Sequence, residues 1–417
     1  MITLIEALNY RCLRHIRQPL GRFHVLVGPN ASGKTTMLDV VEFLGSIVSE
    51  GLEEAIGDRT PDPRNLLFRG EGDLLELAIE AEIPPDLRSH LPLEHTHIRY
   101  EIAVSIDEVT GRPAIRNEAL MFKQESTASE DQRTLFPELI LPPQTIAARG
   151  RSTKRVLSKN AKSGKDNFYP EVKKGQGGGW VPSFQLGPYR SALANLPEDE
   201  TRFPVATWFK NLLSQRIQKI ILDSLTMRRA SPPGQTDRFK TDGSNLPWVV
   251  ERLIQENPEK FRDWIAHLQT ALPDLFSLRT VEREDDRHRY LVIRYANEFD
   301  VPSWLVSDGT LRLLALTLPA YLPNLEGVYM IEEPENGIHP KAVDTLIQSL
   351  SNVYRAQVLL ASHSPVILSA TDSAEVLCFA KGEDGATDIV AGDRHPALLD
   401  WQQDTSLGVL FAAGVLG

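Results

Sequence analysis

Residues 28–35 have the types and the spacing of a loop that binds phosphate groups. The segment is Gly28-Pro29-Asn30-Ala31-Ser32-Gly33-Lys34-Thr35, and it matches the pattern GxxxxGK[ST] without a mismatch. Its glycines let the backbone curl so that successive N–H groups point at phosphate oxygens. We expect Lys34 to reach the β- and γ-phosphates of a nucleotide and the Thr35 hydroxyl to bind Mg²⁺. An accidental glycine-rich turn is the alternative. The apolar run before the segment and the helix-like stretch after it disfavour that alternative.

Two acidic residues follow a second apolar run. Residues 328–331 are Val, Tyr, Met and Ile, and Glu332 and Glu333 come next. Ligands of open α/β sheets bind at the carboxyl ends of the strands. We therefore expect Glu332 to hold Mg²⁺ and Glu333 to orient or deprotonate the attacking water. Aspartate is commoner at the first position, but the longer Glu332 side chain can still reach a metal. The alternative is a strand end followed by a solvated acidic turn.

Two further segments are consistent with the same chemistry. Ser307-Asp308-Gly309-Thr310 opens a helix, and free N–H groups at a helix start bind anions. The alternative is a plain helix start with Ser307 or Asp308 as its cap, and both interpretations can hold. His363 follows a buried apolar run and is expected to contact a γ-phosphate. A lone histidine is more often structural, but the three other motifs favour the functional interpretation.

The surrounding pattern predicts the elements that position these residues. Strands are expected before residue 28, at 65–82, 97–107, 277–283 and 289–296, and helices at 33–48, 203–223 and 246–271. The last 110 residues alternate helix and strand, which predicts an α/β fold with a partly parallel sheet covered by helices. We divide the chain into segments 1–110, 111–190, 191–296 and 297–417.

The middle of the chain is basic. Residues 149–174 contain nine Lys or Arg residues against Asp166 and Glu171, a net charge of 9 − 2 = +7. The favoured interpretation is a mobile, solvated loop. The alternative is a flexible arm that contacts nucleic-acid phosphates, DNA above all.

Composition excludes several classes of protein. With 417 residues, 41% of them hydrophobic, the chain can build a sizeable core, but no run approaches the roughly 20 apolar residues of a membrane span. Its net charge of −11 argues against indiscriminate binding to nucleic acid. The N-terminus does not read as a signal peptide, and Cys12 and Cys378 cannot form a disulfide framework or a four-ligand zinc site. We expect a cytoplasmic protein without a membrane segment.

The four motifs, in this order, resemble those of the ATP-binding-cassette ATPases of the SMC/RecF/OLD-like branch. The resemblance is carried by the opening Asn9-Tyr10-Arg11-Cys12, by GPNASGKT, and by SDGTLR, EEPENGIHP and LLASHSP, and it covers 1–45 and 300–370. Residues from 242 onward are similar to standalone bacterial ATPases of this type, whereas the resemblance does not extend to 110–180. The resemblance implies a P-loop NTPase fold like that of SMC heads, with a mixed sheet, an antiparallel β subdomain and an inserted helical lobe.

The resemblance also assigns roles to single residues. Lys34 and Thr35 fall on Walker A, Glu332 and Glu333 on Walker B, and His363 on the switch histidine. The nucleotide-binding set would comprise Arg11, Asn30, Ala31, Ser32, Gly33, Lys34, Thr35, Thr36, Ser307 and Gly309. Gln185 is a weak candidate for the Q-loop and a third metal ligand, beside Thr35 and Glu332. Ser307 and Gly309 fall on the signature motif, which in this family completes the site of the opposite protomer. Two chains would thus enclose two ATP·Mg²⁺.

The implied function is an ATP hydrolase that couples closure of a homodimer to a conformational switch. The switch would act on nucleic acid or on a partner effector, in bacterial anti-phage defence or DNA repair. Only 54 residues follow His363, too few for the Toprim nuclease domain of OLD proteins, so we expect the effector to be a separate protein. Two alternatives stay open: a transporter-type ABC ATPase subunit, and an ATP-gated scaffold with little turnover.

Overall fold

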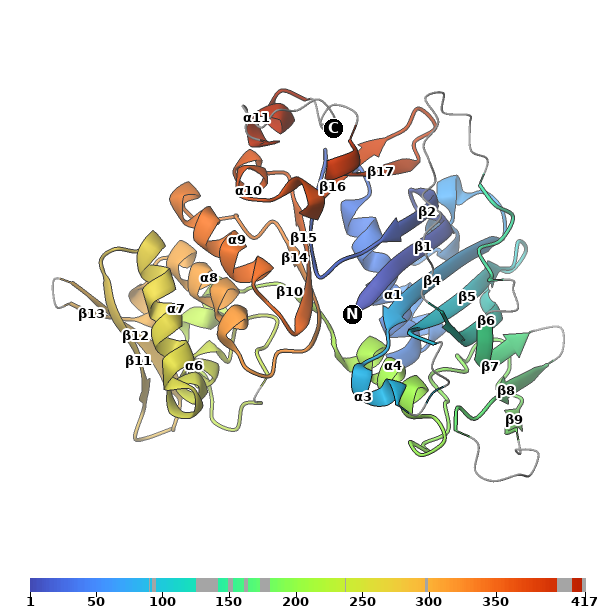
Figure 1. Cartoon of the computed structure of the whole chain (residues 1–417), viewed down its shortest axis with the longest axis horizontal. Coiled ribbons are helices and arrows are strands. Elements are labelled where there is room, and N and C mark those ends of the chain that lie inside the picture. Colours follow the sequence, from blue (N-terminus) through green and yellow to red (C-terminus); the bar gives the residue numbers. More distant parts are fainter. Residues whose placement is uncertain are drawn as a thin grey trace. The chain divides into compact units, whose positions relative to one another are not determined.

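The computed structural model describes residues 1–89, 91, 95–124, 142–148, 153–160, 164–172, 181–236, 238–296, 299–395 and 407–414 (Figure 1). The chain folds as two compact units made of separate segments. The first comprises Met1–Gly21, Ala31–Ile217 and Ala380–Ile389, and the second comprises Arg22–Asn30, Gln218–Phe379 and Val390–Gly417. The first unit runs through the predicted boundaries at 110 and 190, and the second through the one at 296.

The first unit contains an eight-stranded antiparallel sheet. Its order is β2 (Leu13–Pro19), β1 (Ile2–Tyr10), β4 (Leu74–Glu82), β5 (His97–Ile106), β6 (Pro113–Lys123), β7 (Thr153–Asn160), β8 (Lys165–Phe168) and β9 (Ser183–Phe184). Among the described residues of this unit, the α-helices are α1 (Lys34–Ser49), α2 (Leu52–Gly57), α3 (Pro85–Arg88) and α4 (Pro204–Gln215). Helix α1 is buried over most of its length, and Phe43 stacks on Tyr10 of β1 with ring centroids 5.7 Å apart. This packing fixes the helix against the sheet.

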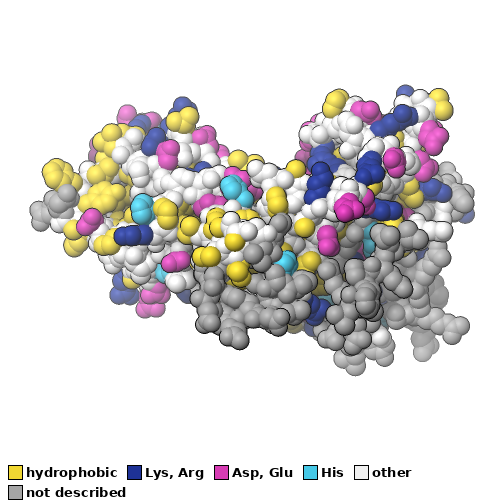
Figure 2. All heavy atoms as spheres, turned by 90° about the horizontal axis from the view of Figure 1, so that it is seen from above, with side chains coloured by type: hydrophobic (Ala, Val, Ile, Leu, Met, Phe, Trp, Pro, Cys, Tyr) yellow, Lys and Arg dark blue, Asp and Glu magenta, His cyan; other side chains and the backbone are white. Residues whose placement is uncertain are grey.

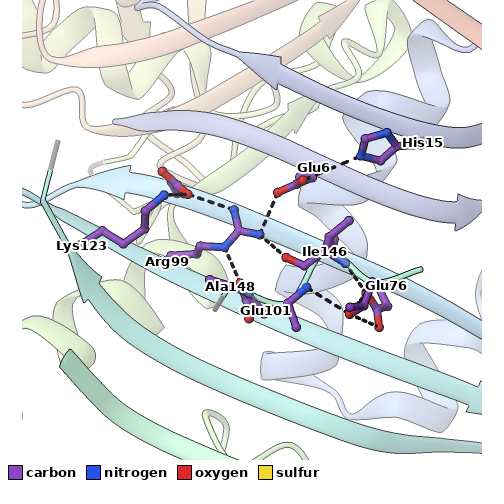
Figure 3. A network of polar contacts seen from close by, with 11 residues as sticks. Glu6, His15, Glu76, Arg99, Glu101, Lys123, Ile146 and Ala148 are labelled. Atoms are coloured by element: carbon purple, nitrogen blue, oxygen red, sulfur yellow. Dashed lines mark hydrogen bonds and ion pairs between the residues drawn. The ribbon is translucent and has the colours of Figure 1, made fainter. Parts of the chain in front are cut away.

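The polar face of this sheet carries a buried ionic network (Figure 3). Arg99 of β5 forms ion pairs with Glu6 of β1 (2.7 Å), Glu80 of β4 (2.9 Å) and Glu101 of its own strand (2.5 Å). The backbone N–H groups of Ile146 and Ala148 donate to Glu76 and Glu101, at 2.7 and 2.8 Å. A segment far along the chain is thereby tied to the sheet through carboxylates.

The prediction of a loop at 149–174 is wrong for the residues that form β7 and β8. Lys159 is buried, and its Nζ lies 2.9 Å from Asp166 Oδ1 and donates to the Gly187 carbonyl at 2.7 Å. Lys154 Nζ donates to the Glu171 carbonyl at 3.0 Å. These cations hold the sheet edge together and are not an exposed arm. The remaining positions 149–152, 161–163 and 173–174 lie outside the described residues.

The second unit is built on parallel strands. Its strands follow the order β10 (Ile217–Ile220), β14 (Gly327–Glu332), β15 (Ala356–Ser362), β3 (Phe23–Val27) and β16 (Val376–Lys381). The next strand in the chain is β17 (Thr387–Ala391), whose first three residues belong to the first unit. The pairs β14–β15, β15–β3 and β3–β16 are parallel. Helices α5 (Ser224–Arg228), α6 (Leu246–Glu256), α7 (Pro258–Ala271), α8 (Asp308–Thr317), α9 (Val343–Ser351), α10 (Pro365–Ser369) and α11 (Leu407–Ala412) complete the unit.

Helices α6 and α7 form the predicted helical lobe, together with an antiparallel sheet of β11 (Leu275–Glu282), β12 (Arg289–Tyr295) and β13 (Asp300–Pro302). The buried Trp264 of α7 anchors the lobe, because its Nε1 donates to Thr317 Oγ1 of α8 at 2.9 Å. Phe276 and Phe299 are exposed beside this sheet, where apolar side chains gather at the left of Figure 2. The predicted α/β class, mixed sheet, antiparallel subdomain and helical lobe are confirmed.

Three predicted elements differ in extent. The helix expected at 246–271 is two helices, because Pro258 begins a new one and disfavours helical geometry at Asn257. The helix at 203–223 ends at Gln215, since the β-branched Ile217 and Ile220 lie in a strand. The strand at 65–82 begins only at Leu74. Short 3₁₀ helices occupy Pro63–Leu66, Phe68–Gly70, Ser303–Leu305, Leu318–Tyr321, Pro340–Ala342, Ser373–Glu375 and Gly392–Arg394.

Candidate functional site

The loop between β3 and α1 has the backbone of a phosphate cradle. Gly28 (φ 152°), Ala31 (φ 62°) and Gly33 (φ 105°) all have positive φ, a region that only glycine enters without strain. Helix α1 begins at Lys34, and no side chain caps its N-terminus. The start of a helix presents backbone N–H groups that can bind an anion, and it adds the positive end of the helix dipole. Ser32 Oγ is buried and has no hydrogen-bond partner among the described residues. These features fit a bound phosphate.

Residues of β1 and the β1–β2 turn hold the start of α1 in the first unit. Asp39 of α1 accepts from Tyr10 Oη at 2.5 Å and from Arg59 Nε at 2.8 Å, and it lies 3.0 Å from Arg11 Nη1. Burial and the Asp39 carboxylate raise the pKa of Tyr10. Cys12 Sγ lies 3.3 Å from Thr36 Oγ1. Arg11 in the β1–β2 turn is thus held against α1, the helix that carries Lys34, Thr35 and Thr36.

Three parallel strands bring other predicted residues to one edge of the second unit. Glu332 is in register with Ala361 of β15, and Ser362 is in register with Val27 of β3. The carboxyl ends of β3, β14 and β15 therefore lie side by side. Gly28, the Glu332–Glu333 pair and His363 each follow one of these ends. This is the edge at which open α/β sheets bind their ligands.

The Glu333 carboxylate is held by two side chains and is open to water. Glu333 Oε1 lies 3.1 Å from His363 Nδ1, and Glu333 Oε2 accepts from Asn336 Nδ2 at 2.6 Å. The Glu333 and His363 side chains are 44% and 50% exposed, so water can reach the pair. Glu333 also has a positive φ of 48°, which for a residue other than glycine is strained. This combination suits a residue that positions or deprotonates water.

Two neighbouring carboxylates are held differently. Glu332 Oε1 lies 2.7 Å from Lys219 Nζ of β10. Glu335 Oε1 accepts from Ser362 Oγ at 2.5 Å, and Ser362 Oγ accepts from the Ser364 N–H at 2.9 Å. Burial raises the pKa of Glu335. Glu335 thus braces the turn that carries His363.

The signature segment starts a helix and also touches the turn after Glu333. Ser307 is the N-cap of α8, because its Oγ accepts from the Thr310 N–H at 3.2 Å. The cap interpretation is confirmed, and the anion site stays a prediction. A Cβ on Gly309 would lie 2.3 Å from the Gly337 carbonyl oxygen, so only glycine fits there. The signature helix is therefore in direct contact with the turn at 333–337.

Gln185 is not brought to the phosphate-binding loop. It follows β9, the edge strand opposite β2, whereas α1, which begins where the loop ends, contacts Cys12 at the β1–β2 turn of the same unit. Within the described ranges, no group of three or more His, Cys, Asp or Glu residues is arranged to hold a metal, and no helix is long and apolar enough to cross a membrane.

Sequence reasoning missed three contacts of the acidic residues. Asn336 and Glu335 lie in the EEPENG segment, and Ser362 precedes His363, so their positions carried a local signal. The position of Lys219 carried no local sequence signal, because only strand pairing brings β10 to β14.

Comparison with known proteins decides the family. A family model described as "AAA domain, putative AbiEii toxin, Type IV TA system" matches residues 23–369. The chain belongs to this family. A retron Vc95 probable ATPase from Vibrio cholerae serotype O1 biovar El Tor is 24% identical over 163 residues, which are 34% of this chain and 31% of that relative. The match thus spans about a third of each protein.

Solved structures of Smc heads share the fold. An SmcHead bound to the C-winged helix domain of ScpA superposes with a TM-score of 0.53 at 13% identity, covering 93% of this chain and 97% of that one. A Pyrococcus furiosus Smc head with an extended coiled coil, bound to the C-terminal domain of ScpA, gives 0.50 at 12% identity, covering 93% and 95%. The predicted resemblance to AAA/ABC-type ATPases of the SMC/RecF-like kind is therefore confirmed, as is the fold of a P-loop NTPase.

Proposed function

We propose that this AAA-domain protein hydrolyses ATP and uses the reaction to switch a partner effector. The observation that carries the proposal is the Glu333–His363 pair, 3.1 Å apart, on the sheet edge where the phosphate-binding loop also begins. A general base must lie within hydrogen-bond reach of the proton that it abstracts, and a half-exposed carboxylate at this edge can meet a water molecule there.

Each residue of the site has a role in this proposal. Lys34 and the N–H groups at the start of α1 neutralise phosphate charge, while Thr35 and Glu332 hold Mg²⁺. When bound, the Mg²⁺ stabilises the charge that develops on the transferred phosphoryl group. Glu333 accepts a proton from water, and His363 keeps its carboxylate oriented. Because Glu332 is paired with Lys219, it would have to break this ion pair in order to hold the metal.

The proposed site is completed by a second copy of the chain. The exposed Ser307 at the start of α8 would contact the nucleotide of the partner, as the resemblance to SMC-like ATPases implies. Its neighbour Gly309 touches Gly337 in the turn that follows Glu333. Docking of the second copy at α8 could therefore shift the turn that follows Glu333, the carboxylate proposed to activate water. ATP would close the dimer, and loss of the γ-phosphate would open it.

The output proposed is control of a separate effector in bacterial defence. The similarity to a retron ATPase and the family description of a type IV toxin system support a defence role. The Smc heads were solved with a domain of another protein, which supports a separate partner here. A DNA-binding arm at 149–174 could not use Lys154 or Lys159, because both side chains form hydrogen bonds within the first unit.

Light scattering of the Glu333→Gln variant tests the proposal. ATP·Mg²⁺ should double its mass, because the variant binds nucleotide but cannot hydrolyse it. Lys34→Ala in the same background should stay at the mass without nucleotide. A mass indifferent to ATP in a variant that binds ATP would contradict the shared site. Normal dimer formation without any turnover by the wild type would favour the ATP-gated scaffold. Added duplex DNA should leave the mass unchanged.

A further inference from the structure

The hairpin at residues 380–389 lies against the phosphate-binding loop within the first unit. Thr387 Oγ1 donates to the Ser32 carbonyl oxygen at 2.9 Å, and the Thr387 N–H donates to the Cys12 carbonyl at 2.9 Å. Thr387 is 7% exposed and Ser32 is 2% exposed. A residue that follows the loop by 355 positions thus forms a buried hydrogen bond with it. A buried carbonyl that loses such a partner costs more than an average hydrogen bond contributes.

The Thr387 side chain also fills the space beside Gly33. A Cβ on Gly33 would lie 2.1 Å from Thr387 Oγ1 and 2.9 Å from its Cγ2. Gly33 has a φ of 105°, so its backbone and its surroundings both require glycine. The loop and the hairpin are therefore packed without room for an intervening atom.

The same hairpin is anchored at its turn. Asp384 Oδ2 lies 3.0 Å from Arg14 Nη1 of β2, and Arg69 Nη2 donates to the Asp384 carbonyl. Asp384 Oδ1 accepts from the Ala386 N–H at 3.0 Å. The Ala386 N–H and the Arg14 guanidinium lower the pKa of Asp384. Asp384 thus ties the turn of the hairpin to Arg14 of β2, although its side chain is 41% exposed.

A planar peptide bond links these contacts to phosphate binding. The Ser32 carbonyl and the Gly33 N–H belong to one peptide unit, and in a trans peptide they point in opposite directions. No cis peptide bond occurs among the described residues. When the Ser32 carbonyl points at Thr387, the Gly33 N–H therefore points away from Thr387. A phosphate cradle needs backbone N–H groups that point at the phosphate oxygens.

We infer that Thr387 is a positioning residue for the phosphate-binding loop, and that its hydroxyl orients the Ser32–Gly33 peptide for the phosphates of a bound nucleotide. The inference rests on the proposed nucleotide binding. Thr387 touches no substrate in this scheme and acts only through the loop. Its contribution should be the same for ATP and ADP, because both present phosphates to the loop.

The test is nucleotide affinity of the full-length chain, measured by titration calorimetry with ATP and with ADP. Thr387→Val keeps the shape and removes the donor, and it should weaken both ligands by about tenfold, which corresponds to about 1.4 kcal/mol. Its KM for ATP should rise while kcat stays near the wild-type value. Thr387→Ser retains the hydroxyl and should restore most of the affinity.

Thr60→Val is the matched control. Thr60 is 9% exposed in the same unit, and its Oγ1 donates to the Asp62 carbonyl at 3.0 Å. This variant should lose stability without losing nucleotide affinity. Wild-type affinity in Thr387→Val would overturn the inference and leave the proposed function standing. No nucleotide binding by the wild type would overturn both. If Thr387→Val does not fold, wild-type affinity in Thr387→Ala overturns the inference.

Discussion

Two groups of carboxylates in this molecule are held in opposite ways. On the eight-stranded sheet, Glu6, Glu80 and Glu101 surround Arg99, and all four side chains are 10% exposed or less. At the end of β14, Glu333 is 44% exposed and is held by His363 and Asn336. The carboxylates of the first group pair with the Arg99 guanidinium, whereas Glu333 is held by the His363 ring and the Asn336 amide.

The difference separates a structural carboxylate from the one that we propose to act in catalysis. A buried carboxylate needs a cation and hydrogen bonds to offset its desolvation. A carboxylate held in this way is not available to accept a proton from water. Burial alone would lower the pKa of Arg99, but Glu101 and Glu6 raise it above its ordinary value, so the guanidinium stays charged at every accessible pH. Glu333 is 44% exposed, so water can reach its carboxylate. We therefore expect substitutions to affect stability in the first group and turnover in the second.

Removing Arg99 should have the largest effect on folding. Arg99→Met leaves Glu6, Glu80 and Glu101 without their shared cation and should lower the free energy of unfolding by about 3–5 kcal/mol. Urea unfolding measures the change. Arg88→Met is the control, because its pair with Glu82 is largely exposed and should contribute less than about 1 kcal/mol. Equal losses of unfolding free energy in Arg99→Met and Arg88→Met would show that burial of the network does not add to its effect on stability.

Glu171 sharpens the comparison, because its carboxylate is buried and bound by backbone N–H groups. It accepts from Val205 and Ala206 at 2.8 and 2.7 Å, and burial raises its pKa from 4.5 to about 7. Between these values the folded protein binds a proton that the unfolded chain does not. Stability should therefore fall as the pH rises from 4.5 to 7, by up to about 3 kcal/mol.

The comparison for this pH effect is the Glu171→Gln variant. Its unfolding free energy should depend less on pH than that of the wild type, because the titrating group is gone while the shape is kept. Urea unfolding at pH 5, 6 and 7 gives the difference between the two proteins. A wild type that gains stability relative to Glu171→Gln over this range would contradict the raised pKa.

A smaller effect is expected for Asn336, which orients the reactive carboxylate. Asn336→Ala removes the 2.6 Å hydrogen bond to Glu333 and should lower kcat about fivefold, or about 1 kcal/mol. Steady-state phosphate release measures this change. The free energy of unfolding should stay constant, because both side chains are exposed at the sheet edge. An unchanged kcat would mean that His363 alone orients Glu333.

Much of the reactive edge could be predicted from the sequence. Parallel strands present their carboxyl ends at one edge, so apolar runs followed by Gly28, Glu332 and His363 were enough to place three groups together. Ser307 could be predicted as a helix cap because serine before a helical run satisfies free N–H groups. These inferences needed only local sequence and one rule of topology.

Other features depend on contacts that no local pattern carries. β7 has only Val156 and Leu157 as apolar residues in an otherwise basic stretch, so its pairing with β6 could not be distinguished from a loop. The contacts of Thr387 with Ser32 and of Lys219 with Glu332 join positions more than a hundred residues apart. They follow from how the sheets assemble, which the sequence does not display.

The most direct test measures turnover and stability together in Glu333→Gln and Glu101→Gln. Glu333→Gln should lose at least about 100-fold in ATP turnover, since it lacks the proton acceptor, and keep the wild-type free energy of unfolding. Glu101→Gln should keep turnover per folded molecule and lose about 1–3 kcal/mol of stability, because it weakens the Arg99 network. Wild-type turnover in Glu333→Gln, or the same losses in both variants, would contradict this division between a structural and a reactive group of carboxylates.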